Sequence, residues 1–307
     1  MTRHVVLGAG PVARAIVESL KKRSIDVEVV TRSGTEIPGA RAVTANVLDT
    51  DRLSSVVNGA AAVYQASQPE YHRWPQEFPA LQDSVVRATR GTDAVLVAVE
   101  NLYGYGAVKG PISEQHPLSA TTRKGKTRAE LWRSLEAEHR AGRLKVTAGR
   151  ASDFFGPHVS ASVVGDRFFP PVLNGKKAEI LGSADTLHTY NYVGDFGEAL
   201  VRLALDERSL GRAWHVPNAP TVTTRAFLEA AASIAGVAPR YVVRSKGQVK
   251  LLGLFIAPVR ETVEMMYEFE EDFVVDHSAY ASTFGDHATP IHDALATTIA
   301  WWRQHQQ

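Results

Sequence analysis

Residues 4–16 read HVVLGAGPVARAI, and this stretch decides the fold of the first half of the chain. A short apolar run with the composition of a strand meets Gly8 and Gly10, and a helical pattern then begins at Pro11. Gly8 is expected to make the tight turn, and Gly10 to let the backbone approach a pyrophosphate. Pro11 suits the first helical turn, where its missing N–H costs nothing, and the amides from Val12 onward can hold negative charge. The stretch therefore predicts the start of a dinucleotide-binding βαβ unit.

The end of the next expected strand indicates which dinucleotide binds. This strand, residues 27–31, ends about twenty residues after the glycines, where chains that bind NAD often carry an acid for the ribose 2′-hydroxyl. Thr31, Arg32 and Ser33 stand there instead, and arginine pairs well with a 2′-phosphate. We therefore expect NADP(H) in preference to NAD(H). The alternative is that Arg32 is a solvated turn residue, and Arg14 is either a second charge at the phosphates or a surface arginine.

Bulk composition narrows the class of protein. With 307 residues, of which 44% are hydrophobic and 22% charged, the chain is globular and long enough for one large domain or two lobes. A net charge of +1 without a basic block argues against nucleic acid as a partner. The chain has no cysteine, which excludes disulfides and thiolate sites, and its histidines show no metal-ligand spacing.

The sequence also gives an expectation for location. No signal peptide precedes the first expected strand, and the longest apolar run near the C-terminus, residues 251–259, is broken by Gly253 and Pro258. We therefore expect a cytoplasmic protein that does not bind membranes.

Expected strands and helices alternate through the first half of the chain, which predicts an α/β fold with a Rossmann-type, doubly wound parallel sheet. Beyond the first two strands and the first helix, we expect strands over 42–47, 61–66, 94–99 and 144–147, helices over 51–58, 80–89 and 126–140, and a polar aromatic loop over 67–79. After Pro157 the sequence becomes irregular and rich in Gly, Pro and aromatic residues.

Further short motifs follow along the chain, namely NVLD at 46–49, LYG at 102–104, ISEQHPL at 112–118, FFGP at 154–157 and HTYNYVGD at 188–195. Together with the glycine turn, their order resembles that of the extended and atypical short-chain dehydrogenase/reductases, of the NAD-dependent epimerase/dehydratase type. The resemblance implies that Asn46 and Asp49 lie near the adenine. It also implies a dinucleotide-binding domain over 1–157 and about 189–215, and a smaller C-terminal substrate lobe over about 158–188 and 216–307.

The helix after the fifth strand departs from the catalytic pattern of this superfamily. Its oxidoreductases carry a Tyr-x-x-x-Lys pair, in which the tyrosine moves a proton as hydride transfers. Here Lys124 stands in the place of the tyrosine and Arg128 in that of the lysine. Arg128 remains a candidate ligand of the ribose or phosphate, and Lys124 is either an acid or a solvated or phosphate-facing lysine. A literal pair, Tyr105 and Lys109, lies among glycines, where no helix is expected.

Three residues near the fifth strand are candidates for the chemistry. Glu100 matches the aspartic acid of related dehydratases and is a candidate general acid, or else a polar residue that satisfies loop amides. Tyr103 is a second catalytic candidate, and Tyr105 a candidate substrate contact, unless both rings pack under the glycine-rich loop. Asn101 replaces the glutamate base of those dehydratases, so their chemistry is not expected.

In the C-terminal half, Arg167, His188 and Tyr190 are candidate substrate residues, although a salt bridge is the alternative for Arg167. Apolar residues at 251–255 and 265–267 indicate a hydrophobic pocket, core, or a homodimer face.

Three functions are compatible with these motifs, and the choice among them rests partly on analogy of fold. The leading hypothesis is an NADP(H)-dependent oxidoreductase of the atypical group that reduces a small carbonyl or conjugated substrate. The second is a non-catalytic, NADP(H)-sensing or partner-binding protein, and the third is an epimerase or isomerase that uses bound NADP transiently.

Overall fold

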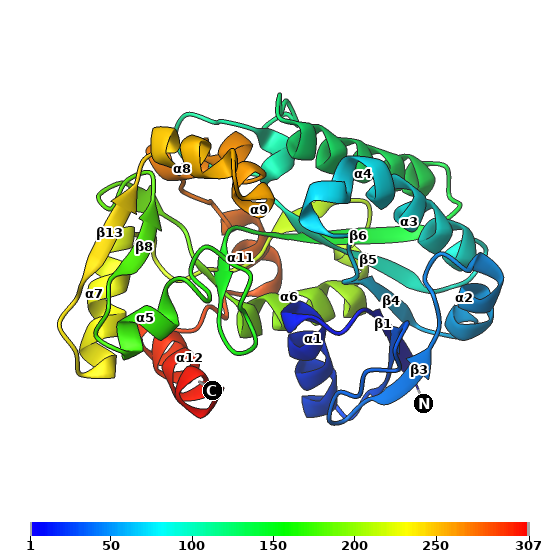
Figure 1. Cartoon of the computed structure of the whole chain (residues 1–307). Helices are drawn as coiled ribbons and strands as arrows, with labels where there is room; N and C mark the ends of the chain where they lie inside the picture. Colours follow the sequence, from blue (N-terminus) through cyan, green and yellow to red (C-terminus); the bar gives the residue numbers. More distant parts are fainter. Residues whose placement is uncertain (1, 306–307) are drawn as a thin grey trace. The chain divides into compact units, whose positions relative to one another are not determined.

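The computed structural model, shown in Figure 1, describes residues 2–305. The chain forms two compact units. The first comprises Met1–Gly106, Pro117–Arg150 and Phe196–Val216, and the second comprises Ala107–His116, Ala151–Asp195 and Pro217–Gln307. The chain passes from one unit to the other near residues 150 and 195. Residues 107–116 belong to the second unit, where Ile112 forms a parallel bridge with Val275.

A seven-stranded sheet organises the first unit. Its strands are β1 (Arg3–Leu7), β2 (Asp26–Thr31), β3 (Arg41–Thr44), β4 (Ala62–Gln65), β5 (Val95–Asn101), β6 (Lys145–Ala151) and β11 (Ala213–His215). They lie in the order β11-β6-β5-β4-β1-β2-β3, and parallel pairing joins β4 to β5, β4 to β1, β1 to β2 and β2 to β3. The order reverses between β1 and β4, and such a switch point is where open α/β sheets bind ligands.

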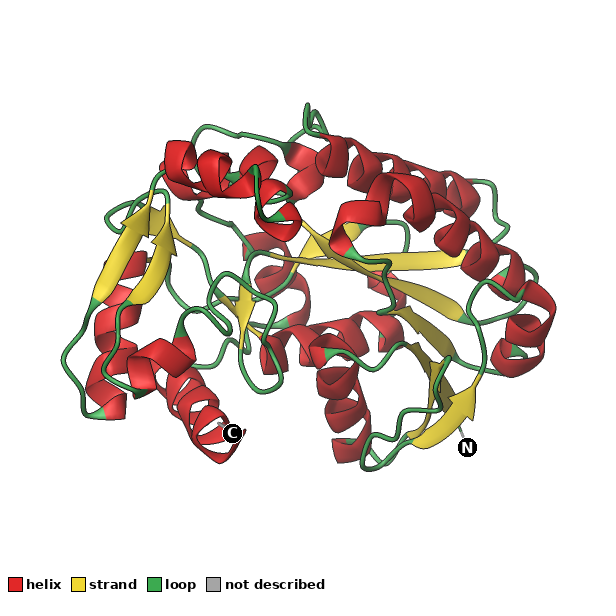
Figure 2. Cartoon of the chain, viewed as in Figure 1, coloured by secondary structure: helices red, strands yellow, loops and turns green. Residues whose placement is uncertain are grey.

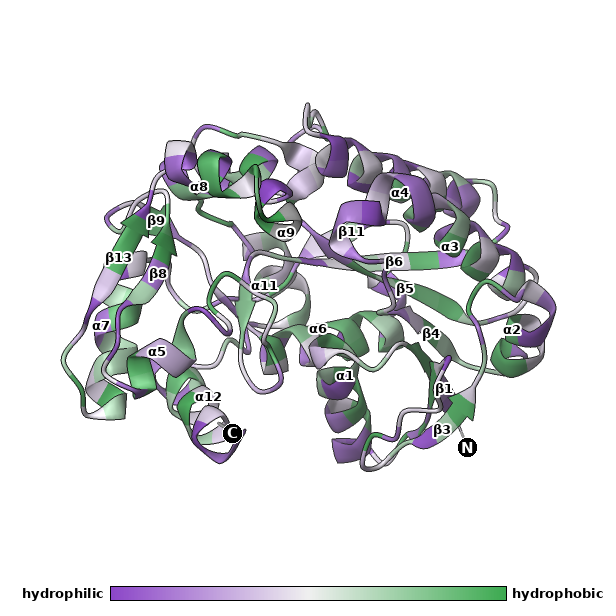
Figure 3. Cartoon of the chain, in the orientation of Figure 1, coloured by the Kyte–Doolittle hydropathy of each residue, from purple (hydrophilic) through white to green (hydrophobic). Residues whose placement is uncertain are grey.

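Helices cover both faces of this sheet (Figures 1 and 2). They are α1 (Pro11–Lys22), α2 (Thr50–Val57), α3 (Trp74–Thr89), α4 (Arg123–Arg140) and α6 (Val193–Leu205), with short 3-10 turns η1 (Tyr71–Arg73), η2 (Tyr103–Tyr105) and η3 (Glu207–Ser209). Strands covered on both faces are typically apolar, as the first five residues of β5, VLVAV, are (Figure 3). Val5, Leu7, Val63 and Leu96 are fully buried in the core.

Two expected boundaries in this unit are wrong. Within the expected loop over 67–79, only residues 67–70 lack regular structure, because η1 begins at Tyr71 and α3 at Trp74. Pro75 fits the first turn of α3, and the buried rings of Trp74 and Phe78 pack against Leu131, which outweighs the cost of Pro79 inside the helix. Helix α4 begins at Arg123 rather than at 126.

The second unit has helices around three two-stranded sheets. The parallel pairs are β7 (Phe154–Phe155) with β10 (Asn191–Tyr192) and β8 (Ala178–Leu181) with β13 (Tyr241–Arg244), and the antiparallel pair is β9 (Leu187–His188) with β12 (Val222–Thr223). Its helices are α5 (Phe169–Leu173), α7 (Thr224–Ala235), α8 (Lys246–Gly253), α9 (Ala257–Arg260), η4 (Val263–Met265), α10 (Tyr267–Glu270), α11 (Ser278–Phe284) and α12 (Ile291–His305). Helices α5, α7 and α12 share one apolar core.

The apolar residues near the C-terminus differ in burial. Met265 and Met266 are buried, whereas Leu251, Leu254 and Phe255 are 60%, 71% and 84% exposed. A core role for these three residues is therefore wrong. No helix within residues 2–305 combines the length and apolar character that a membrane span requires.

Candidate functional site

The glycine turn lies at the carboxyl end of β1, at the switch point of the sheet. Gly8 has a φ of +106°, and a Cβ there would lie 3.1 Å from the backbone of Ser67, so the fold itself requires this glycine. Gly10 precedes α1 with a φ of −72°, and within residues 2–305 no heavy atom other than those of Gly10 and its two chain neighbours lies within 4 Å of the place of its missing Cβ. The absence of a side chain at Gly10 therefore leaves open space at the start of the helix.

The first turn of α1 can receive an anion. No side chain caps this helix in the described structure, and its first turn contains no acidic residue. Pro11 lies half-buried and Val12 buried at its start. The unbonded amides and the positive end of the helix dipole therefore remain for a negatively charged group.

Unpartnered polar atoms mark the same edge of the sheet. Gln65 ends β4, beside Leu7 of β1, and Ser67 follows two residues later. Within residues 2–305, the buried Gln65 Oε1 and Ser67 Oγ have no hydrogen-bond partner. Buried polar atoms are nearly always bonded, so these two fit a polar ligand at the switch point, as a bound dinucleotide would be.

The turn after β2 carries the residues expected at the cofactor phosphate. Thr31 Oγ1 accepts a hydrogen bond from the Thr35 amide at 2.8 Å, and Ser33 Oγ lies 2.8 Å from Thr35 Oγ1. Arg32 is exposed, and its side chain bonds to no other residue of the described chain. Arg14 is half-buried and likewise has no partner among residues 2–305. Two arginine side chains without an ion-pair partner in the part of the chain that the structure describes, Arg14 on α1 and Arg32 in the turn after β2, thus carry positive charge at this edge of the sheet.

The residues expected near the adenine form local hydrogen bonds. Asn46 Oδ1 accepts from the Leu48 amide at 3.1 Å. Asp49 caps α2, accepting from the Arg52 amide at 3.1 Å. Both side chains lie on the exposed turn after β3, and their contact with an adenine stays a prediction.

Lys124 and Arg128 lie one turn apart on α4, and both are buried. Lys124 is 1% exposed, so the expectation of a solvated lysine is wrong. Its Nζ lies 4.4 Å from the centre of the Tyr71 ring. The Arg128 Cζ lies 4.3 Å from the centre of the Trp74 ring and 4.5 Å from that of Phe78. The Tyr71 ring of η1 therefore lies against Lys124, and two rings of α3 lie against Arg128.

The Arg128 guanidinium is only partly satisfied. It donates to the Val99 carbonyl oxygen at 3.3 Å and to Gln68 Oε1 at 3.4 Å, while Nε has no partner in the described structure. Burial lowers the pKa of Arg128 to about 10, against the opposing effect of nearby Glu100 and Tyr103. A buried cation with an unsatisfied N–H fits an anionic or strongly polar ligand beside it.

Two tyrosines lie against this pair of cations. Tyr71 Oη donates to Tyr103 Oη across 3.4 Å, and both side chains are half-buried. The Tyr103 amide donates to Asn101 Oδ1 at 3.2 Å. The sequence does not point to Tyr71, because the loop expected over 67–79 includes it; its three-residue spacing from Trp74 is the available signal.

Glu100 and Tyr105 belong to a buried polar chain across three strands. Glu100 Oε2 accepts from Arg150 Nε at 3.1 Å, and Arg150 Nη1 donates to Tyr105 Oη at 2.7 Å. Tyr105 Oη lies 2.9 Å from His215 Nε2, and the Tyr105 side chain is 1% exposed. The Glu100 side chain is therefore engaged by a buried guanidinium. This placement favours a structural role for both residues.

The literal Tyr-x-x-x-Lys motif does not form a helical turn. The 3-10 turn η2 ends at Tyr105, and Gly106 has a φ of +74°. Lys109 therefore does not share a helix face with Tyr105.

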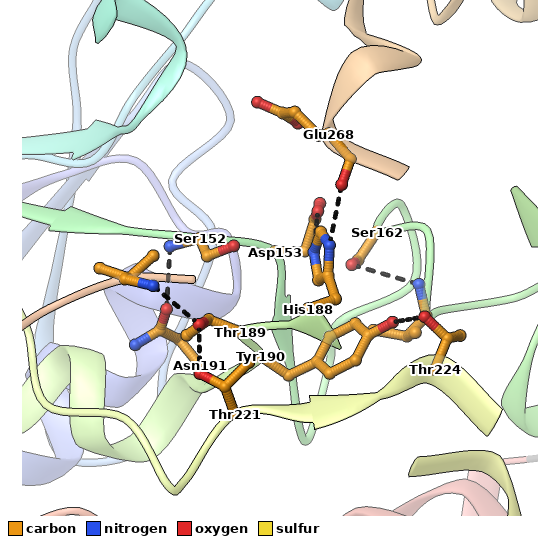
Figure 4. Close-up of polar contacts among 12 residues, drawn as sticks. Ser152, Asp153, Ser162, His188, Thr189, Tyr190, Asn191, Thr221, Thr224 and Glu268 are labelled. Atoms are coloured by element: carbon orange, nitrogen blue, oxygen red, sulfur yellow. Dashed lines mark hydrogen bonds and ion pairs between the residues drawn. The ribbon is translucent and has the colours of Figure 1, made fainter. Parts of the chain in front are cut away.

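In the second unit, His188 is the centre of a separate polar group (Figure 4). Its Nε2 lies 3.0 Å from Asp153 Oδ2, and its Nδ1 lies 3.1 Å from the Glu268 carbonyl oxygen. The two ring nitrogens thus face a carboxylate oxygen on one side and a backbone carbonyl oxygen on the other. Burial, and then the charge of Asp153, raise the pKa of the Glu268 carboxyl well above its usual value.

The other candidates of this unit have ordinary partners. Tyr190 is 5% exposed and its hydroxyl lies 2.9 Å from Thr224 Oγ1. The Arg167 side chain is 62% exposed and lies 3.8 Å from Glu179, which agrees with the salt-bridge alternative. No cluster of three or more possible metal ligands occurs in the part of the chain that the structure describes.

Comparison with solved structures shows the same fold. The enzyme WbmH of Bordetella bronchiseptica, in complex with NAD+, superimposes with a TM-score of 0.75 at 19% identity over 99% of both chains. UDP-glucuronic acid 4-epimerase of Bacillus cereus, with UDP-glucuronic acid and NAD, gives 0.80 at 14% identity over 99% of this chain and 100% of that chain. DesIV of Streptomyces venezuelae, a dTDP-glucose 4,6-dehydratase with NAD bound, gives 0.77 at 18% identity over 99% and 98%.

A search of curated proteins found no match. The family model of the NAD-dependent epimerases and dehydratases matches residues 4–216, which include the glycine turn, α4 and all seven strands of the sheet apart from the first residue of β1. The chain therefore belongs to the NAD-dependent epimerase/dehydratase family, a family of enzymes that use a nicotinamide dinucleotide.

Proposed function

We propose that the protein is an NADP(H)-dependent oxidoreductase that reduces a small carbonyl or conjugated substrate. The observation that carries the cofactor choice is Arg32, which is exposed at the end of β2 and bonds to no residue within 2–305. Its neighbours Thr31 and Ser33 are hydroxyl residues rather than acids. A guanidinium there stabilises a 2′-phosphate, whereas a carboxylate would stabilise a free 2′-hydroxyl.

The remaining residues of the site fit the rest of the dinucleotide. The open space at Gly10 and the uncapped start of α1 would hold the pyrophosphate, and Asn46 and Asp49 would lie near the adenine. Arg128 would hold a ribose or phosphate oxygen with its unpartnered Nε. The cofactor supplies the hydride when it is bound.

The chain's own part of the reaction is proton transfer. Tyr103 is half-buried and lies beside Tyr71 and Trp74. The buried cation Lys124 lies against the Tyr71 ring, and the buried cation Arg128 lies against the Trp74 ring. A phenol in this setting can protonate the oxygen of a substrate carbonyl, because the nearby positive charges stabilise the phenolate that remains. Tyr103 is thus assigned the role of general acid, which the ion pair of Glu100 with Arg150 disfavours for Glu100.

Binding measurements on Arg32→Ala test the cofactor choice. Losing a charge-assisted contact of about 1.5–3 kcal/mol should raise the Kd for NADPH roughly 10- to 100-fold and leave the Kd for NADH unchanged. Arg87→Ala is the matched control, because Arg87 is an exposed helix arginine paired with Asp83. Equal NADPH affinity in Arg32→Ala and the unmodified protein would show that Arg32 is only a solvated turn residue.

A panel of aldehydes, ketones and enones, followed by NADPH absorbance, tests the reaction. Turnover of any of them supports the oxidoreductase. Tight NADPH binding without turnover of any substrate would instead favour a non-catalytic, NADP(H)-sensing protein. The buried pairing of Glu100 with Arg150 favours this second candidate, since it withdraws one family acid from the chemistry. Tighter binding of NADP+ than of NADPH would further support the non-catalytic, NADP(H)-sensing protein.

A further inference from the structure

We propose that Tyr71 is a catalytic residue, which passes a proton to Tyr103 in a two-tyrosine relay that Lys124 and Arg128 stabilise. The inference rests on the proposed reductase function and names residues of that same site. It gives a role to Tyr71, which lies in no family motif of the sequence.

The geometry of the two tyrosines is the first step. Tyr71 in η1 follows β4, and Tyr103 in η2 follows β5, so both lie at the carboxyl edge of adjacent strands. Tyr71 Oη donates to Tyr103 Oη at 3.4 Å. Trp74 packs edge-on against Tyr71, with ring centres 5.0 Å apart, and lies 6.1 Å from Tyr103. The indole thus holds both phenols in place.

The two tyrosines and the two cations of this site differ in exposure. Tyr71 and Tyr103 are half-buried, and their hydroxyls are hydrogen-bonded to each other. Lys124 and Arg128 are 1% and 7% exposed, with aromatic rings against them. In this proposal the less buried phenols exchange protons, and the cations act through their charge.

The charges favour a phenolate at this place. The Lys124 ammonium lies 4.4 Å from the centre of the Tyr71 ring, where a cation attracts the ring electrons and attracts a phenolate more strongly. The charges of Tyr103 and Tyr71 also act on Arg128, whose pKa they raise against burial. Both cations therefore lower the cost of removing a proton from the tyrosine pair.

When bound, the reduced cofactor would supply a hydride to the carbonyl carbon of the substrate and would itself be oxidised, and the C=O π pair would move to oxygen. The oxygen takes the proton of Tyr103 Oη, whose O–H bond breaks. Tyr103 takes a proton from Tyr71 Oη along the existing hydrogen bond, and the Tyr71 phenolate, facing Lys124, is reprotonated by water.

Four variants test the relay. Tyr103→Phe should lower kcat by about 10²- to 10⁴-fold, the usual contribution of a general acid. Tyr71→Phe should lower kcat at least about tenfold and change its pH profile, because a single tyrosine must then recover its proton directly from water. Lys124→Met removes the charge, and Lys124→Arg should restore part of the activity. Tyr241→Phe in the second unit is the matched control.

A second readout does not depend on turnover. Phenolate absorbance of the cofactor-free protein, followed as pH rises, should show an early-ionising tyrosine that disappears in Tyr71→Phe or Tyr103→Phe and ionises at higher pH in Lys124→Met. Unfolding temperature and NADPH affinity should match those of the control in Tyr71→Phe. A merely structural Tyr71 would change the unfolding temperature without removing that ionisation.

The outcomes separate the two proposals. Wild-type turnover with an unchanged kcat and pH profile in Tyr71→Phe would overturn the relay alone. An absorbance titration identical in all variants would also overturn it. Failure of the wild-type protein to reduce any substrate while binding NADPH would overturn the reductase function, and the relay with it.

Discussion

The two glycines after β1 are required for different physical reasons, and only the structure distinguishes these reasons. The sequence predicts both as parts of a dinucleotide turn. In the structure Gly8 has a left-handed backbone and a close backbone neighbour in Ser67, whereas Gly10 has an ordinary φ and open space at the place of its missing Cβ. Gly8 is thus needed for folding, and Gly10 for the close approach of a ligand.

Substitutions at these glycines should separate stability from binding. Gly8→Ala should lower the free energy of unfolding by about 1–3 kcal/mol, because the backbone is strained and the Cβ crowds Ser67. Gly10→Ser should change it by less than about 0.5 kcal/mol, since serine caps helices well, yet raise the Kd for NADPH at least about tenfold. Urea unfolding and calorimetry measure the two effects. Gly10→Ser that binds NADPH like the wild type would contradict this assignment.

The ion pair of Glu100 and Arg150 should be a strong single-residue contributor to stability. Both side chains are about 5% exposed, so removing one leaves an uncompensated buried charge. Arg150→Met should therefore cost about 3–5 kcal/mol in urea unfolding, and adding Glu100→Gln should recover part of it. Arg87→Met, at an exposed pair, should cost no more than about 1 kcal/mol. A cost for Arg150→Met as small as that of the control would exclude a buried pair.

At the scale of elements, the sequence predicts those whose pattern is local. The apolar runs of β1, β2 and β5 and the N-terminal turn of α1 are such cases. The sequence does not predict the start of α3, because Pro75 and Pro79 are typical of a loop, while the burial of Trp74 and Phe78 against α4 is a tertiary effect. For the same reason the sequence places Lys124 on a helix but does not show its burial against Tyr71.

The contact between α1 and α6 should make stability depend on pH. Burial alone would raise the pKa of Glu198, but hydrogen bonds from Arg23, Arg202 and Ser19 outweigh it and lower the pKa from 4.5 to about 2. Because the folded pKa is depressed, this stabilisation is present above about pH 4.5 and is lost as the pH falls toward 2. It amounts to at most about 3 kcal/mol.

Urea unfolding of Glu198→Gln against the wild type measures this contribution. The difference in free energy of unfolding should be largest near neutral pH and shrink in acid. Glu18→Gln is the control, because Glu18 is 69% exposed in its pair with Lys22 on α1. A difference for Glu198→Gln that stays constant with pH would exclude the depressed pKa.

At the scale of the whole molecule, alternating strands and helices predict the Rossmann-type sheet, and the family match agrees with it. The second unit is harder to predict, because its small sheets join distant segments, as in the pairing of β8 with β13. The candidate site divides in the same way. Its glycines and Arg32 follow from local motifs, whereas Tyr71 and the partner of Glu100 depend on packing between elements.

A crystal structure of the protein with NADPH is the most direct test of the account. We predict that the 2′-phosphate contacts Arg32, that the pyrophosphate lies at Gly10 and the first turn of α1, and that Tyr103 faces the nicotinamide. A complex in which the 2′-phosphate points away from Arg32, and apolar side chains separate the nicotinamide from Tyr103, would contradict the NADP(H)-dependent reductase.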